Sequence, residues 1–246
     1  MDILNKIQSN TGQLALLIDP EKTKNEEHLI ELVRKAEFAL IDFFFVGGST
    51  VTRKEIETVV SGLKKHTSIP VVLFPGSGNQ LSEHADALLF LNLISGRNPD
   101  FLSGHHVSCA EEVLEMNMEV IPTSYILIDG GKMTSVAYVS QTTPIPRENS
   151  SISLKTGIAG YLMGQKLTYF DAGSGALQSV PEKLISELKQ KIDTPVIVGG
   201  GIRSIEQIEQ FKQAGANVIV IGNKIEENMD FLLDIASYQK TSFRAD

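Results

Sequence analysis

Two glycine-rich turns near the end of the chain have the composition of a phosphate-binding site. The apolar run 196–198 leads into Gly199-Gly200-Gly201, and the apolar run 218–221 leads into Gly222-Asn223. A helix-like segment follows each turn, and the first N–H groups of a helix have no partner within it. Glycine reaches φ > 0 cheaply and keeps no side chain between the backbone and a ligand. One such turn is more often only a connection, but two in succession predict a shared phosphate site.

Two aspartates follow other apolar runs and could act on a bound substrate. Asp19 ends the run that begins at Leu14 and is followed by proline, whereas Asp171 closes a run that also contains Tyr169. The turn Gly173-Ser174-Gly175 comes next, so a carboxylate, an aromatic ring and a flexible turn lie within a few residues. These groups could bind or deprotonate a hydroxyl. Taken by itself, Asp19 is better explained as a turn or capping residue.

The positions of the other reactive residues give little indication of a functional site. His105 and His106 are adjacent, so on a helix they face different directions and do not readily chelate one metal. Cys109 is the single cysteine, which excludes an internal disulfide and indicates a buried or idle thiol. Arg97 could clamp an anion or be solvated, and the sequence favours neither.

Predicted strands and helices, which would position these residues, alternate along most of the chain. Short apolar runs predict eight strands, at 14–18, 41–46, 70–74, 87–91, 120–128, 167–171, 196–198 and 218–221. Periodic segments predict helices at 25–40, 52–65, 101–116, 153–165, 181–191 and 226–237. This order favours a TIM (β/α)8 barrel as a single domain, 1–246, with the active site at the carboxyl ends of the strands. A doubly wound open sheet is the second choice.

The middle of the chain departs from plain alternation. Asp129-Gly130-Gly131-Lys132 has the composition of a hairpin turn, and 134–139 is predicted to be the returning strand. In the run Phe43-Phe44-Phe45, only alternate side chains can face the barrel interior, so the others must pack under helices.

Composition excludes several classes of function. The 246 residues carry a net charge of −8, which argues against a nucleic-acid partner. The first residues lack the pattern of a targeting signal, and no apolar run approaches the ~18 residues of a membrane span. With one cysteine, these features predict a cytoplasmic protein without a transmembrane segment.

Several stretches together resemble one family of enzymes. They are Leu17-Ile18-Asp19-Pro20-Glu21-Lys22, Val46-Gly47-Gly48-Ser49, Phe74-Pro75-Gly76, Ser95-Gly96-Arg97-Asn98-Pro99, Tyr169-Phe170-Asp171-Ala172-Gly173-Ser174-Gly175-Ala176, Val198-Gly199-Gly200-Gly201-Ile202-Arg203 and Ile221-Gly222-Asn223. In this order they resemble the geranylgeranylglyceryl phosphate synthases and their bacterial heptaprenylglyceryl phosphate relatives. The resemblance spans residues 17 to 223.

The resemblance implies a barrel prenyltransferase that joins sn-glycerol 1-phosphate to a polyprenyl diphosphate, with geranylgeranyl diphosphate expected. It implies Mg²⁺ at Asp19 and Ser49, and an oligomer. It also implies glycerol phosphate binding by Tyr169, Phe170, Asp171, Ala172, Gly173, Ser174, Gly175, Gly200, Gly201, Gly222 and Asn223. The last two turns coincide with the phosphate site predicted from the residues themselves.

Within this hypothesis, Asp171 accepts the proton of the glycerol hydroxyl or orients it, and Tyr169 orients the same acceptor. The prenyl chain is expected in an apolar groove near the second to fourth strands and the glycine-bearing helix around Tyr161. The lipid product could bring the protein into transient contact with a membrane surface. The alternatives are a sugar-phosphate isomerase or aldolase, or a non-catalytic phosphate-binding barrel.

Overall fold

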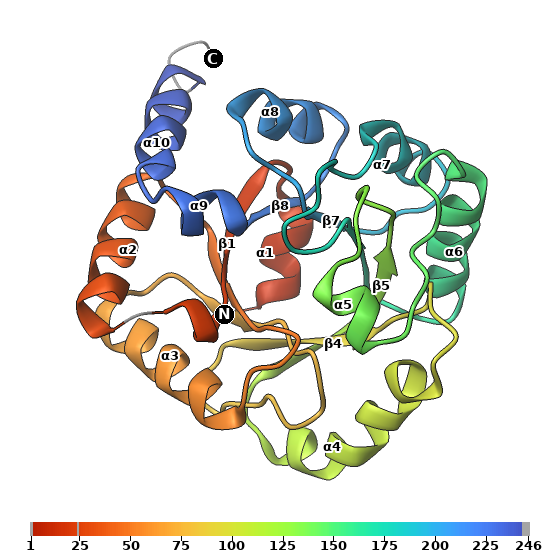
Figure 1. Ribbon diagram of the computed structural model, residues 1–246, viewed down its shortest axis with the longest axis horizontal. Helices are drawn as coiled ribbons and strands as arrows, with labels where there is room; N and C mark the ends of the chain where they lie inside the picture. The colour runs from red at the N-terminus through yellow and green to blue at the C-terminus, as the bar shows by residue number, and fades with distance from the viewer. Residues whose placement is uncertain (1, 24, 243–246) are drawn as a thin grey trace.

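Eight parallel strands close into a barrel in this computed structural model, which describes residues 2–23 and 25–242. Figure 1 shows the helices arranged around these strands. Consecutive strands pair, and β1 pairs with β8 to complete the ring. The strands are β1 (Gln13–Ile18), β2 (Phe43–Val46), β3 (Val71–Leu73), β4 (Ala87–Asn92), β5 (Glu119–Leu127), β6 (Leu167–Asp171), β7 (Val196–Gly199) and β8 (Val218–Ile221). The predicted barrel is confirmed; of the predicted domain range 1–246, residues 1, 24 and 243–246 lie outside the described residues.

Most helices cover the outside of the barrel, and several, including α2, α3, α6 and α8, begin at a polar residue whose side chain caps the helix. The side chain of Thr52 accepts the Glu55 N–H while Glu55 accepts the Thr52 N–H, so α3 begins with a capping box. The helices are α1 (Ile3–Ser9), α2 (Glu26–Phe38), α3 (Arg53–His66), α4 (His105–Glu115), α5 (Ser135–Val139), α6 (Ser150–Leu162), α7 (Glu182–Lys189), α8 (Ile205–Gln213), α9 (Asn223–Glu227) and α10 (Phe231–Ser242), with a 3₁₀ turn η1 (Pro20–Lys22) and a π-helical turn η2 (Asp100–Gly104). None of the described helices is both long and apolar enough to cross a lipid bilayer.

The core has two layers because strand side chains alternate between the faces of the sheet. Phe43 and Phe45 belong to the cluster inside the barrel, whereas Phe44 packs in the cluster between the strands and the helices. The predicted division of the phenylalanine run is therefore confirmed.

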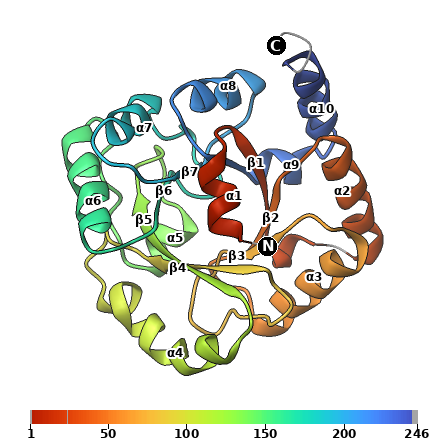
Figure 2. The same cartoon turned by 180° about the vertical axis from the view of Figure 1, so that it is seen from behind.

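Helix α1 closes the end of the barrel at which the strands begin. Figure 2 shows it lying across this end. Ile3 and Ile7 pack with the interior cluster, and Glu119 at the start of β5 accepts the N–H groups of Ile3 and Leu4 at 2.5 and 3.0 Å. With this end covered, a substrate reaches the interior from the opposite end, where the strands terminate.

The predicted hairpin after β5 is wrong. Residues 135–139 form the helix α5, and the isolated bridge between Ile128 and Ile145 is parallel. β5 already pairs with β4 on one side and β6 on the other. A closed barrel leaves no free edge for a returning strand.

One strand is followed by no helix, and one predicted helix differs in its extent. No helix is assigned between β3 and β4, so the segment 74–86 crosses the rim as an irregular loop. The predicted last helix, 226–237, is divided into α9 and α10 around Asn228, whose side chain accepts the Asp230 N–H.

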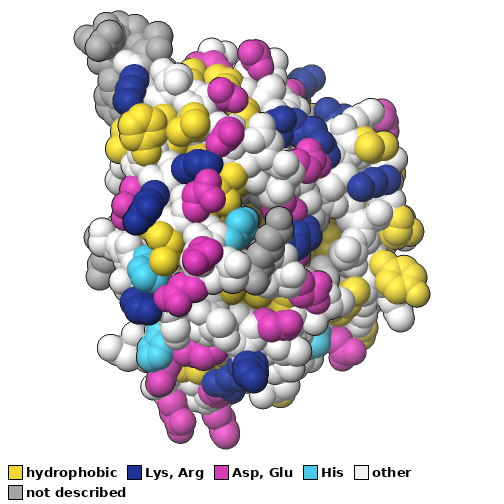
Figure 3. Space-filling view, turned by 60° about the vertical axis from the view of Figure 1, so that its left-hand side comes forward, with side chains coloured by type: hydrophobic (Ala, Val, Ile, Leu, Met, Phe, Trp, Pro, Cys, Tyr) yellow, Lys and Arg dark blue, Asp and Glu magenta, His cyan; other side chains and the backbone are white. Residues whose placement is uncertain are grey.

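Charges of both signs share the outer surface. On the face in Figure 3, which carries α2, α3 and α10, acidic and basic side chains are interspersed. Lys35 lies 2.7 Å from Asp230, and Lys65 lies 2.8 Å from Glu26. This face therefore lacks the continuous basic area that a nucleic acid requires.

Candidate active site

One cavity of about 280 Å³ opens at the carboxyl ends of the strands. Its polar end is lined by residues from both glycine-rich turns, after β7 and after β8, and by the two predicted aspartates. They include Asp19, Ser49, Asp171, Ser174, Gly175, Gly200, Gly201, Gly222 and Asn223. The structure thus brings together residues from β1, β2, β6, β7 and β8, at the end of the barrel that holds active sites in this fold.

The corner after β7 needs glycine for its backbone. Gly200 and Gly201 have φ of +82° and +70°, which side-chain-bearing residues rarely adopt. A Cβ on Gly200 would lie 2.6 Å from the Gly173 nitrogen and 2.7 Å from Asp171 Oδ1. The backbone of β7 therefore approaches the turn after β6 closely.

Asn223 fastens the turn after β6 to the end of β8. Its Oδ1 accepts the Gly175 N–H at 2.5 Å and the Ser174 hydroxyl at 3.1 Å. Its Nδ2 donates to Glu226 at 3.0 Å. The three glycine-containing turns are thus held in one fixed group.

Three of the predicted binding residues lie outside the cavity wall. Phe170 and Ala172 are buried in the cluster between strands and helices, and Gly173 is not part of the wall. Phe170 follows Tyr169 on the strand and must face away from the interior.

Asp171 is buried beneath the polar end with both oxygens engaged. Tyr125 donates its hydroxyl to Oδ2 at 2.6 Å, and the Gly173 N–H donates to Oδ1 at 2.8 Å. Burial raises the pKa of Asp171, while these two hydrogen bonds act in the opposite direction. A carboxylate oxygen accepts more than one hydrogen bond, so a substrate hydroxyl can still be received.

Tyr125 is the site residue that the sequence reasoning missed. It lies on β5, opposite Tyr169 in the register of the sheet. Burial, followed by the neighbouring Asp171 charge, raises the pKa of Tyr125 well above its usual range, so the hydroxyl remains a donor. Its mostly apolar strand resembled ordinary core, and the sequence carried no signal that linked Tyr125 to Asp171.

Three aromatic rings separate the polar end from the apolar end. Phe74 stacks on Tyr169 with centroids 5.1 Å apart, and Tyr125 meets both rings edge-on. The Tyr169 hydroxyl occupies the space beside Gly199, where a Cβ would lie only 2.5 Å away. Glycine at that position therefore lets the ring reach the interior of the barrel.

Asp19 and Ser49 both line the rim, with Asp19 serving as a cap as well. Its Oδ1 accepts the Glu21 N–H at 3.1 Å, and its Oδ2 lies 3.6 Å from Lys22 Nζ. Burial raises the pKa of Asp19, against the effect of the Lys22 charge. The capping and the functional interpretations of Asp19 are thus compatible.

The rim has the donors that magnesium uses beside a phosphate ligand. Among the described residues, no group of three or more His, Cys, Asp or Glu side chains is arranged for a metal. Mg²⁺ commonly takes one or two carboxylates and completes its shell with water and substrate phosphate oxygens. The Asp19 carboxylate and Ser49 hydroxyl fit that kind of site.

The apolar end of the cavity extends between β4 and α4. Its wall contains Leu88, Phe90, Phe101, His106 and Cys109. The His106 ring meets Phe90 edge-on at 4.4 Å, and burial lowers the pKa of His106. These contacts give the wall an apolar character.

The sequence prediction for this region is confirmed in part. A groove near the second to fourth strands is present, but Tyr161 on α6 is outside its wall. Arg97, for which the sequence left two roles open, donates to the Gly96 carbonyl at 2.6 Å and is also outside the wall. Cys109 is buried, as predicted.

Comparisons with known proteins agree with this arrangement. Residues 6–239 match the model of the PcrB family. The geranylgeranylglyceryl phosphate synthase of Chitinophaga pinensis is 45% identical over 90% of this chain and 88% of its own. That of Pyrococcus furiosus is 42% identical over 86% and 83% of the two chains.

A solved structure extends the similarity to three dimensions. The (S)-3-O-geranylgeranylglyceryl phosphate synthase from Thermoplasma acidophilum was determined in complex with its substrate, sn-glycerol-1-phosphate. It matches with a TM-score of 0.88 at 33% identity, over 96% of this chain and 94% of that one. This chain therefore belongs to the PcrB family, together with these geranylgeranylglyceryl phosphate synthases.

Proposed function

We propose that this protein joins sn-glycerol 1-phosphate to a polyprenyl diphosphate through an ether bond and releases diphosphate. Geranylgeranyl diphosphate is the expected prenyl substrate. The observation that carries the proposal is a single cavity with an anion-binding end of glycine corners and an apolar end between β4 and α4. Family membership and the relatives' names support the same reaction.

The glycerol phosphate belongs at the polar end. The turns at Gly200-Gly201 and Gly222-Asn223 offer backbone N–H groups to its phosphate. The 3-hydroxyl then points toward the rings of Tyr169 and Tyr125 and the carboxylate of Asp171. Holding the acceptor in one orientation supplies a large part of the rate acceleration.

The prenyl diphosphate belongs across the rim, with its chain in the apolar groove. The diphosphate lies beside Asp19 and Ser49, which would hold Mg²⁺. A bound Mg²⁺ supplies positive charge that stabilises the departing diphosphate. The aromatic rings border the position where positive charge develops on the allylic carbon, and ring faces attract cations.

The reaction replaces one C–O bond with another. The glycerol oxygen forms a bond to the allylic carbon as the bond from that carbon to diphosphate breaks. The hydroxyl proton passes to Asp171, whose ionised form is an acceptor. Tyr125 and the Gly173 N–H hold that carboxylate in place.

The proposal extends to the setting of the enzyme. We expect a cytoplasmic homo-oligomer whose lipid product brings it into transient contact with a membrane surface. Exposed apolar side chains at the end of α6, Tyr161 and Leu162, support an interface between subunits. Light scattering during size-exclusion chromatography measures the assembly.

Incubation with sn-glycerol 1-phosphate, prenyl diphosphates of several lengths and Mg²⁺ tests the reaction. Mass spectrometry should find the prenyl ether, with equimolar diphosphate, and omission of Mg²⁺ should abolish it. Interconversion of sugar phosphates in place of the ether would favour the isomerase alternative. Binding of glycerol phosphate without any turnover would favour a non-catalytic barrel.

A further inference from the structure

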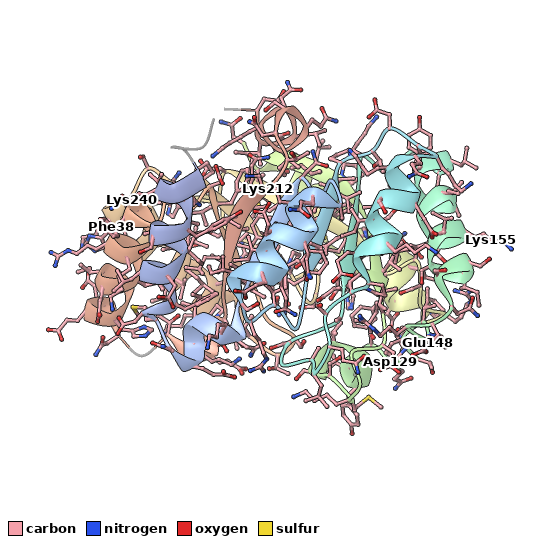
Figure 4. All side chains as sticks on the ribbon, turned by 90° about the horizontal axis from the view of Figure 1, so that it is seen from above. Phe38, Asp129, Glu148, Lys155, Lys212 and Lys240 are labelled. Carbon is pink, nitrogen blue, oxygen red and sulfur yellow. The ribbon has the colours of Figure 1, made fainter. Side chains whose placement is uncertain are left out.

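The loop between β5 and α5 lies against the turn that carries Ser174. The Gly130 carbonyl accepts the N–H groups of Leu177 and Gln178 at 2.9 and 3.1 Å. A Cβ on Gly130 would lie 2.5 Å from the Ala176 Cβ. Figure 4 shows Asp129, near the start of this loop, beside α5 and at the opposite end of the barrel from α1.

Lys132, in this loop, reaches the turn Gly173-Ser174-Gly175 after β6. Its Nζ lies 2.9 Å from the position that a Cβ on Gly175 would occupy. Gly175 and Ser174 belong to the cavity wall, and Ser135 and Val136, just after Lys132 in the chain, belong to it too. Lys132 itself is exposed and lies outside the cavity wall, so its ammonium group is beside Gly175 at the outer edge of the polar end.

We propose that Lys132 is a further anion-binding residue of this site, which neutralises the phosphate of the bound glycerol phosphate. The inference rests on the proposed function and adds a residue that the sequence resemblance did not include. A phosphate monoester carries a charge of about −1.5 to −2 at neutral pH. A lysine ammonium is a common partner for such a group.

The Lys and Arg side chains that line the cavity in the described part of the chain, Lys22 and Arg203, are already paired. Lys22 lies 2.7 Å from Glu226, and Arg203 lies 3.2 Å from Glu227. Within the described residues, no carboxylate lies within 4.0 Å of Lys132 Nζ. Lys132 is therefore available to an anion without first breaking an ion pair.

Two further observations describe the polar groups at this edge. The Gly175 N–H is engaged by Asn223 Oδ1, so this donor of the turn is not free for phosphate. Thr134, which follows in the same loop, is buried, and its Oγ1 has no hydrogen-bond partner among the described residues. A Cβ on Gly173 would lie 2.8 Å from that oxygen, so the hydroxyl faces the same turn.

Calorimetric titration of the full chain with sn-glycerol 1-phosphate, without prenyl diphosphate, tests the inference. We expect Lys132→Met to weaken binding by about three- to tenfold, the range for a charged contact that is partly screened by water. Lys132→Arg should retain most of the affinity. Lys155→Met is the matched control, because Lys155 is exposed on α6 and points away from the barrel in Figure 4.

Two further measurements distinguish the loss of the Lys132 charge from a structural effect of the substitution. Added salt should weaken binding more steeply for the wild type than for Lys132→Met, since the variant has lost a screened attraction. In turnover, the variant should raise KM for glycerol phosphate, with kcat and KM for the prenyl diphosphate nearly unchanged.

The outcomes for Lys132 and for the proposed function are distinct. Equal binding by the wild type and Lys132→Met would overturn the role of Lys132, even if prenyl transfer is observed. Weaker binding by the variant, with no turnover of any prenyl diphosphate by the wild type, would support Lys132 and overturn prenyl transfer. A wild type that does not bind glycerol phosphate would overturn both.

Discussion

The substitution Tyr125→Phe removes one hydroxyl from the interior and leaves the ring. That hydroxyl donates to Asp171 Oδ2 at 2.6 Å, and both side chains are buried. The ring contacts with Phe74 and Tyr169 survive, so no cavity opens. The substitution therefore isolates one hydrogen bond to a carboxylate.

The expected loss in the free energy of unfolding follows from the charge and burial of Asp171, which accepts the hydrogen bond. A hydrogen bond to a charged group contributes about 1.5–3 kcal/mol to the free energy of unfolding. Burial raises the pKa of Asp171, and the Tyr125 hydrogen bond opposes that shift. Its removal should raise the pKa of Asp171 further.

The sign of the pH dependence follows from linkage. Because the pKa of Asp171 is higher in the folded protein than in the unfolded chain, the folded state holds more protons between the two values. The contribution of Asp171 to stability therefore falls as pH rises through this window. Above this pH window Asp171 is ionised and the hydrogen bond is charge-assisted, so Tyr125→Phe lowers the free energy of unfolding most. Below the window Asp171 is protonated, and the loss falls to about 0.5–1.5 kcal/mol.

Urea unfolding of the wild type, Tyr125→Phe, Asp171→Asn and the double variant measures this coupling at neutral and acidic pH. Tyr138→Phe is the control, because Tyr138 is 77% exposed. In turnover, the acidic limb of the pH profile should move to higher pH in Tyr125→Phe. A neutral-pH change below about 0.5 kcal/mol, the size of an ordinary surface substitution, would refute the reasoning.

Three other substitutions test separate parts of the site and its support. Asp19→Asn should abolish Mg²⁺-dependent turnover while the melting temperature stays near that of the wild type, because asparagine can still cap the following turn. Gly200→Ala should raise KM for glycerol phosphate, since a Cβ would lie 2.6 Å from the Gly173 nitrogen in a φ > 0 backbone. Gly160→Ala should lower the free energy of unfolding by about 1–3 kcal/mol through overpacking, because its Cβ would collide with Ser124 Oγ.

Each of these has an outcome that contradicts it. Full activity of Asp19→Asn would remove Asp19 from the site. An unchanged KM in Gly200→Ala would place the phosphate elsewhere. Wild-type stability of Gly160→Ala would mean that α6 does not depend on close approach to β5.

The sequence by itself determined the barrel and most of its polar rim. Short β-branched runs such as 218–221 are typical of strands buried on both faces, and parallel strands direct their ends to one side. The turns at Gly200 and Asn223 were therefore predicted to meet, and they do. The spacing of apolar residues predicted most of the helices, because one face of each must pack against the barrel.

Tertiary structure alone decided the segment after β5 and the partner of Asp171. A glycine pair permits a hairpin or a loop, and the choice depended on whether β5 had a free edge, which barrel closure removed. Tyr125 and Asp171 lie 46 residues apart, and their contact depends on the register between two strands. Local residue preferences determine which element forms, but they hold no information about which side chains the closed ring places face to face.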